Sequence, residues 1–495
     1  MGHKVSQIGL KMRARLLRFS SLLLLVGLMS GVGLKAQPRL DLHFNGAQDS
    51  TLIFGYYFAE GRYVQDSIRF DAKGHALWTR DSALDEGLYL FLLPGGETVD
   101  LLIGHEQHFS YSLDVANLAE SQKVDGSKVS SDFLQFQLFM RKMQEKNELL
   151  RKEDSLVRTL PREAAETKKR EEELKARFDA LDQQVKAYQR RLQDEHAGDV
   201  LGAFVRATIP VTIPEYTPAP EVKNVDSARW MWSYAYHSAH YLDNIDLASP
   251  ALLRTPVVLP KVNYFLDKVL LQIPDTLNKY CDKIIERASA NPETHRYWTS
   301  YLLNKYQSSE LIGMDAVFVH IADQQYLAGK TPWADEDFLR RLKERVDKIR
   351  PNLLWSVAPN FTVETLTGQT FELLKDKAEA TILVFWEPSC SHCRVTIPKL
   401  DSIARRYDPK RLRMIGFMTT GDGPEWQKYV IEHKMEWWVN VWDPYRKSHF
   451  ADTYDIYSTP VVYLLDKDHK IVIKRLGVEA LPEILDDLLG VKKKK

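Results

Sequence analysis

The feature that most constrains the fold of this chain is a pair of cysteines between a predicted strand and a predicted helix. The apolar run 381–386 is rich in β-branched and aromatic residues, which predicts a buried strand. Residues 387–389 (Glu-Pro-Ser) break this strand, and Cys390-Ser391-His392-Cys393 follows. Apolar side chains then recur at helical spacing over 395–404. We therefore expect the dithiol to occupy the first turn of a helix.

This position predicts different roles for the residues of the motif. Unpaired backbone N–H groups and the helix dipole stabilise a thiolate at a helix N-terminus, and the thiolate is the form of cysteine that attacks disulfides. We expect Cys390 to be the nucleophile and Cys393, one turn inside the helix, to resolve the mixed disulfide. An imidazolium at His392 would further favour the Cys390 thiolate, although a solvent-facing histidine without a role is the alternative.

Length, charge and cysteine count restrict the class of protein. The chain has 495 residues, which predicts several domains, and its 67 basic and 67 acidic residues provide no excess charge for binding nucleic acid. Two of its three cysteines lie in one CxxC motif, which favours a dedicated redox pair over a disulfide scaffold. The third, Cys281, falls on an apolar helical stripe and is predicted to be a buried structural thiol rather than a resolving cysteine.

Residues 1–36 have the pattern of a signal peptide. Basic residues come first, an apolar stretch around 22–28 follows, and Ala36 offers a small residue for cleavage before Gln37. The apolar stretch is shorter than a bilayer-spanning helix requires, although an uncleaved anchor is the alternative. The segment therefore predicts export to the periplasm.

The remaining chain divides by pattern into three parts and a tail. Residues 37–127 show strand alternation and hairpin signals, which predict a β-rich domain. Residues 128–350 are mainly helical in pattern, whereas strands and helices alternate over 351–491. The four lysines at 492–495 predict a solvated tail. The predicted fold is multidomain, with an N-terminal all-β domain, a central α-helical region and a C-terminal α/β domain.

Two features stand out in the helical region. Helical patterns on either side of Leu160-Pro161 predict an antiparallel hairpin, whose second helix carries a heptad seam over 174–192. Packing within one protomer is favoured, and self-association through the hairpin is the alternative. One face of a later helix collects aromatic residues, for which core packing is favoured over a substrate grip: Trp230, Tyr234, His237 and Tyr241.

The order of motifs in 351–491 resembles the exported TlpA/ResA-type thioredoxin-like proteins. Trp386, Cys390 and Cys393 match the active-site strand and helix of that family, and Thr459-Pro460 matches its cis-proline loop. Three further matches are the lead-in segment Ala358–Phe361, Pro398, and Gly477 after the last strand. These motifs are specific in combination, whereas CxxC alone is not.

The resemblance implies a thioredoxin-like fold and a thiol–disulfide oxidoreductase that acts as a reductase or isomerase and needs no cofactor. Its implied substrate-binding residues are Trp386, Thr459 and Pro460. Its implied partners are protein or peptide thiols and disulfides, together with a membrane-linked or periplasmic thiol electron donor.

The chain departs from the family at two positions. Thioredoxins have a buried aspartate where this chain has Val384, and ResA-like proteins often have a glutamate where it has Thr396. The proton that Cys393 exchanges must therefore come from elsewhere, with Glu387, His392 and water as candidates.

Several rival roles for the CxxC motif fit the sequence less well. A structural zinc site needs four ligands, so we expect no metal at these two cysteines. A permanent disulfide would close too short a loop to stabilise much. A peroxidase would place threonine or serine where Glu387 stands. In the remaining alternative the upstream domains bind a partner or peptide and the thioredoxin-like module is non-catalytic, a role that does not require Cys390 and Cys393.

Overall fold

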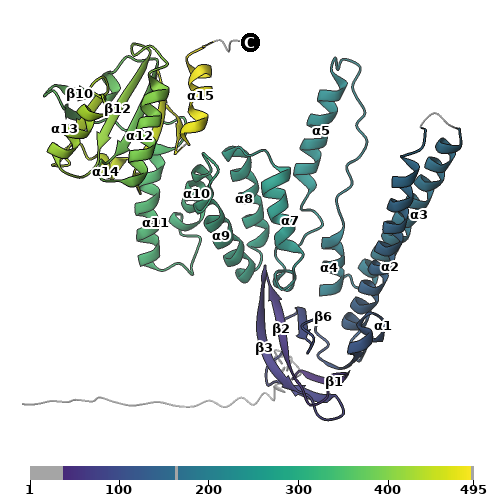
Figure 1. Ribbon diagram of the computed structural model, residues 1–495. Coiled ribbons are helices and arrows are strands. Elements are labelled where there is room, and N and C mark those ends of the chain that lie inside the picture. Colours follow the sequence, from purple (N-terminus) through teal and green to yellow (C-terminus); the bar gives the residue numbers. More distant parts are fainter. Residues whose placement is uncertain (1–36, 162–164, 476, 492–495) are drawn as a thin grey trace, which may run out of the picture.

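The computed structural model describes residues 37–161, 165–475 and 477–491 (Figure 1). The predicted signal peptide and lysine tail lie outside these residues. Among the described helices, none combines the length and apolarity needed to cross a bilayer. The chain forms an N-terminal β domain, a central helical region and a C-terminal α/β domain, which confirms the predicted fold class.

The N-terminal domain is a sandwich of two four-stranded sheets, with strand orders β4-β1-β7-β8 and β3-β2-β5-β6. Buried residues of the two sheets form a shared core that contains Phe44, Phe54 and Phe91. The eight strands are β1 (Arg39–Asn45), β2 (Thr51–Phe58), β3 (Gly61–Arg69), β4 (His75–Thr79), β5 (Gly87–Leu92), β6 (Thr98–Ile103), β7 (His108–Asp114) and β8 (Lys123–Asp125).

A helical hairpin projects from the sandwich, as the sequence predicts (Figure 1). It consists of α2 (Lys128–Val157) and α3 (Ala165–Glu195), which share a small core of Leu150, Val157 and Leu174. Ion pairs join Lys128 to Glu195 and Glu153 to Arg177, so the two helices run antiparallel. The two helices therefore pack against each other, and self-association through the hairpin stays a prediction.

The rest of the helical region forms one large core that also covers the outer face of β2, β5 and β6. Its helices are α4 (Val200–Thr208), α5 (Val225–His240), α6 (Pro250–Leu253), α7 (Val258–Tyr264), α8 (Pro274–Ala288), α9 (Pro292–Gln307), α10 (Asp315–Ile321) and α11 (Glu336–Ile349).

The predicted core packing of the α5 aromatic face is wrong at one end. Trp230 is 61% exposed, because the first half of α5 extends away from the other helices (Figure 1). Its ring stacks on Tyr234 of the next turn, with the centroids 5.7 Å apart. The other end does pack: Tyr241 stacks on Phe265 of the core at 5.0 Å.

The C-terminal domain is built on a seven-stranded sheet of order β10-β9-β13-β12-β11-β14-β15. The central strand β11 is buried throughout and lies parallel to β12 and antiparallel to β14. Helices cover both faces of the sheet. The elements are β9 (Thr362–Thr365), β10 (Thr370–Glu372), β11 (Ala380–Trp386), α12 (Ser391–Ala404), β12 (Leu412–Met418), α13 (Gly423–Glu432), β13 (Val439–Trp442), α14 (Phe450–Thr453), β14 (Val461–Asp466), β15 (Ile471–Lys474) and α15 (Leu481–Leu488).

Polar contacts join the helical region to this α/β domain. Arg345 of α11 forms an ion pair with the buried Asp455, which also pairs with Arg475 at 2.6 Å. The Lys474 ammonium donates to the carbonyl of Asn352 at 2.5 Å. Removing one partner of a buried ion pair is costly, so these contacts fix the position of α11 beside the sheet.

Candidate redox site

The local structure around the two cysteines follows the predicted order. Strand β11 ends at Trp386, and the Cys390 N–H donates to the Glu387 carbonyl at 3.3 Å, which closes the turn. Cys390 is the N-cap residue of α12, with an extended backbone (φ −73°, ψ 122°), and Cys393 lies in the first helical turn. Both thiols are reduced. The dithiol therefore lies at the positive end of a helix.

Cys390 is half-buried and lies beside the Thr459 loop. As a thiol it donates to the Thr459 carbonyl at 3.3 Å. Burial alone would raise its pKa, but hydrogen bonds from the Thr459 side chain, from Cys393 and from the His392 backbone N–H outweigh burial and lower the pKa below the ordinary value. A larger fraction of Cys390 is therefore thiolate at neutral pH than of a free cysteine.

Cys393 has the opposite character. It is buried beneath Cys390, and this burial, reinforced by the neighbouring Cys390 thiol, raises its pKa to about 12. A buried thiol that holds its proton cannot attack a substrate first. It can attack once Cys390 has formed a mixed disulfide next to it. The two pKa shifts thus favour the predicted order of nucleophile and resolving thiol.

His392 contributes to the site through its backbone. Its side chain is exposed, whereas its backbone N–H forms a hydrogen bond to the Cys390 sulfur and helps to lower the pKa of that thiol. The predicted role of its imidazolium stays a prediction.

The predicted substrate contact by Trp386 is wrong for its side chain. Trp386 is completely buried at the end of β11, and its ring packs against Tyr429 of α13 at 5.2 Å. A side chain closed off from solvent supports the strand end beneath the cysteines and does not reach a bound substrate.

The Thr459–Pro460 bond is cis, and both residues are partly exposed next to Cys390. A cavity of about 750 Å³ opens beside this loop. Its walls come from both the α/β domain and the helical region and include Ser458, Pro460, Thr396, Lys399, Tyr306 and Arg345. Sequence reasoning missed Tyr306 and Arg345, because no local motif marks residues so far from the cysteines along the chain.

The side chains predicted as proton donors for Cys393 differ in their surroundings. Glu387 is partly buried at the end of β11, where its carboxylate accepts a hydrogen bond from Thr419 at 2.7 Å. Val384 is fully buried in the strand, and Thr396 lines the cavity. The Glu387 carboxylate is therefore held by a hydrogen bond and is close to the dithiol in sequence, whereas the His392 side chain faces solvent.

Cys281 is separate from this site, as predicted. It lies in the middle of α8 and is completely buried, and burial raises its pKa to about 12. It is a structural thiol of the helical core and not a resolving cysteine.

The fold and the placement of the dithiol define a thioredoxin-fold protein, and comparisons with known proteins agree. The AhpC/TSA family model matches residues 356–474. Thiol-disulfide oxidoreductase ResA of Bacillus cereus is 25% identical over 127 residues, covering 26% of this chain and 72% of ResA. A thioredoxin-like protein of Haemophilus influenzae is 30% identical over 135 residues, covering 26% of this chain and 70% of that protein.

Among solved structures, a thioredoxin-like protein from Bacteroides caccae is 20% identical and aligns with 57% of this chain and 98% of its own, with a TM-score of 0.45. The similarity to the Haemophilus influenzae protein shows that the chain belongs to the thioredoxin-like proteins. Its C-terminal part is a TlpA/ResA-like thioredoxin-fold domain of the kind found in thiol–disulfide oxidoreductases.

Proposed function

We propose that this protein is an exported thiol–disulfide oxidoreductase that reduces or isomerises protein disulfides through Cys390 and Cys393. The observation that carries the proposal is the opposite character of the two thiols. Cys390 is accessible and has a lowered pKa, whereas Cys393 is buried and has a raised pKa. A nucleophile that ionises easily and a protected resolving thiol are what disulfide exchange requires.

In the proposed reaction the Cys390 thiolate attacks one sulfur of a substrate disulfide. A Cys390–substrate disulfide forms, the substrate S–S bond breaks, and one substrate thiolate leaves. Cys393 then loses its proton and attacks the Cys390 sulfur, which releases the second substrate thiol. The protein gives up two electrons as its dithiol becomes the Cys390–Cys393 disulfide. In isomerisation, a different thiolate of the substrate attacks the substrate sulfur of the Cys390–substrate disulfide instead, so a new substrate disulfide forms and the Cys390 thiolate leaves.

Two parts of the protein, the Thr459–Pro460 loop and the adjoining cavity, are proposed to hold the substrate. Thr459 and Pro460 lie half-exposed next to Cys390, where an extended substrate segment can pair with the backbone. The adjoining cavity gives the rest of that segment a place between α12 and α11. Because α11 belongs to the helical region, that region would contribute to the choice of substrate.

The proposed location is the periplasm, and the support for it is the signal-like pattern of residues 1–36 and the scarcity of cysteine. The proposed partners are protein or peptide disulfides and a membrane-linked or periplasmic thiol donor that returns electrons to the Cys390–Cys393 disulfide.

The test is insulin reduction by dithiothreitol, followed by turbidity, with the wild type and Cys390→Ser compared. We expect acceleration by the wild type and none by Cys390→Ser. Cys281→Ser is the matched control, because it removes the one thiol outside the site. Equal acceleration by wild type and Cys390→Ser would refute the proposal.

A partner-binding role with a non-catalytic module is the second candidate. It is favoured by the exposed apolar residues Trp230 and Met231 on α5, which are 61% and 62% exposed. Absence of turnover in the same assay would favour this alternative.

A further inference from the structure

Three polar side chains converge on the outer face of the first sheet of the β sandwich, far along the chain from the cysteines. In β1, Leu40 and Leu42 face the core, so Asp41 and His43 share the outer face. His75 lies on the same face of the neighbouring strand β4, directly opposite His43 in the antiparallel register. The sandwich core fixes both strands and therefore holds the three side chains together.

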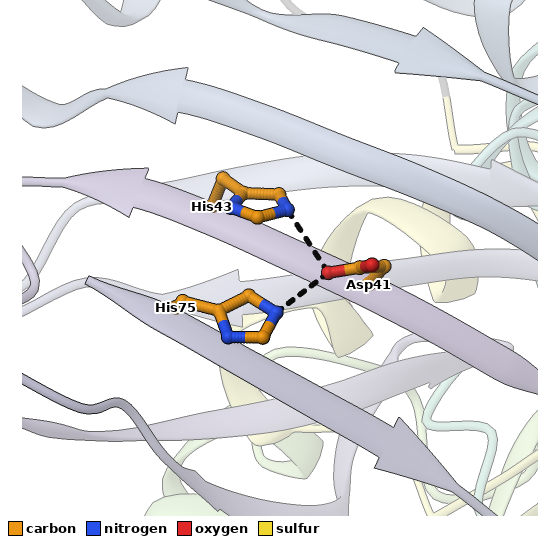
Figure 2. A group of neighbouring side chains, drawn as sticks. All are labelled: Asp41, His43 and His75. Atoms are coloured by element: carbon orange, nitrogen blue, oxygen red, sulfur yellow. Dashed lines mark hydrogen bonds and ion pairs between the residues drawn. The ribbon is translucent and has the colours of Figure 1, made fainter. Parts of the chain in front are cut away.

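The ring nitrogens of the two histidines point at one oxygen atom (Figure 2). The Asp41 Oδ1 lies 2.9 Å from the His43 Nε2 and 2.7 Å from the His75 Nε2. The two imidazoles stack with their centroids 4.6 Å apart. One atom from each of the three residues lies within 4.8 Å of the other two. Two imidazole nitrogens and one carboxylate oxygen this close together form a ligand set that an open zinc site uses, with an ion taking the place of the contacts between them.

We propose that Asp41, His43 and His75 bind a divalent transition-metal ion of the zinc class. Two imidazoles and one carboxylate are ligands that Zn²⁺ accepts, and three protein ligands leave a position for water. The side chains are between 39% and 53% exposed, so an ion can enter from solvent without any movement of the sheet. The sequence did not reveal this site, because His75 is brought to Asp41 and His43 only by strand pairing.

A second cluster of histidine and carboxylate side chains in the same protein differs from this one, because a lysine ammonium already lies among its ligand atoms. Asp132, Glu195 and His196 also gather within ligand distance. There the Lys128 ammonium lies 2.7 Å from Asp132, 3.1 Å from the His196 Nε2 and 3.9 Å from Glu195. A protein cation already occupies that cluster. By contrast, among the described residues Asp41 has no lysine or arginine partner, and its ion pairs are the two histidines.

The groups behind the ligands also suit a metal ion. Metal binding uses the Nε2 lone pairs, so each neutral imidazole must carry its proton on Nδ1 instead. The His75 Nδ1 lies 4.0 Å from the Asp71 carboxylate. Backbone N–H groups of Lys73 and His75 donate to that carboxylate at 2.8 and 2.9 Å and hold it in place. At 4.0 Å this carboxylate is not hydrogen-bonded to the ring, but it places an anchored negative charge on the Nδ1 side of His75.

The test is a calorimetric titration of the full chain with zinc chloride. The parent protein carries Cys390→Ser and Cys393→Ser, so that the dithiol does not bind the ion, and any affinity tag is removed. We expect one zinc ion per chain, with affinity weakened at least about tenfold by His43→Ala and by His75→Ala. His240→Ala is the matched control, because His240 pairs with only one carboxylate, Asp243, at 2.7 Å. It should leave the affinity unchanged.

Circular dichroism checks that each variant is folded, and we expect it to be unchanged because these side chains lie on the solvent side of the sheet. With Cu²⁺ as a second probe, electron paramagnetic resonance should show nitrogen coupling in the parent and lose it in the His43→Ala/His75→Ala double variant. Absence of zinc binding by the parent, or equal binding by the parent and both single variants, would overturn the proposal.

Discussion

Cys281 in the helical region and Cys390 in the thioredoxin-like domain have the same side chain but differ in surroundings. Cys281 lies inside α8, where the helix's own carbonyls use the backbone N–H groups, and burial raises its pKa to about 12. Cys390 caps α12, where free N–H groups and Thr459 lower its pKa despite partial burial. Reactivity thus follows from the place of the sulfur relative to a helix end and to solvent.

The largest expected effect is a difference in activity between a variant of Cys390 and a variant of Cys281. Cys390→Ser should reduce disulfide-reductase turnover to the rate of the small-molecule reductant alone, because no other described thiol is both accessible and easily ionised. Cys281→Ser should retain turnover. Insulin reduction measures both, and loss of activity in both variants would show that the contrast between the two regions is wrong.

The next effect concerns the resolving thiol. Cys393→Ala should stop the reaction after the first attack and leave substrate covalently attached to Cys390, because the buried sulfur that completes the exchange is gone. Non-reducing electrophoresis with mass spectrometry detects the adduct. The Cys390→Ser/Cys393→Ala double variant is the control and should form none. Adduct formation in the control would place the attacking sulfur elsewhere.

The pH dependence of alkylation is a finer probe of the same contrast. Because the pKa of Cys390 is lowered, its reaction with iodoacetamide should persist below the pH at which a free cysteine slows, and should fall only as the pH drops through the lowered pKa. The thiolate also stabilises the folded, reduced protein, and this contribution to the free energy of unfolding is lost as the pH falls through the lowered pKa. Native Cys281 should not react until the protein unfolds. A Cys390 profile matching that of a free cysteine peptide would contradict the argument.

A smaller effect isolates one hydrogen bond. Thr459→Ala removes the side chain that stabilises the Cys390 thiolate, so the pKa of Cys390 should rise. A partly exposed bond to a charged group contributes about 0.5–1 kcal/mol, which corresponds to roughly two- to fivefold slower alkylation at neutral pH. Thr459→Ser keeps the hydroxyl and should restore the rate. Equal rates in all three proteins would assign the shift to the helix end alone.

The smallest effect is on stability. Cys281→Ala leaves a small void in the helical core and should cost about 1 kcal/mol in the free energy of unfolding, while alkylation of Cys390 is unchanged. Urea denaturation followed by tryptophan fluorescence measures this cost. A change in Cys390 reactivity would mean that the helical core and the redox site are coupled.

Local pattern was sufficient for much of the thioredoxin-like domain and its site. The apolar run 381–386 lies within β11, and the predicted helix after Cys390 is α12, because burial, turn residues and helical spacing act over neighbouring positions. The short strands β9, β10 and β13 were missed. They have only three or four residues each, too few to establish a period, and they depend on pairing with neighbouring strands.

The sequence by itself determined the dithiol and its position at a helix start, and it was enough to predict which sulfur attacks, since these depend on residues within a few positions of one another. Tertiary structure alone decided that Trp386 is buried while Trp230 is exposed, and that Arg345 borders the cavity beside Pro460. It also set His75 against Asp41 and His43. The reason is that burial and contact between distant segments are set by chain packing, which no local period encodes.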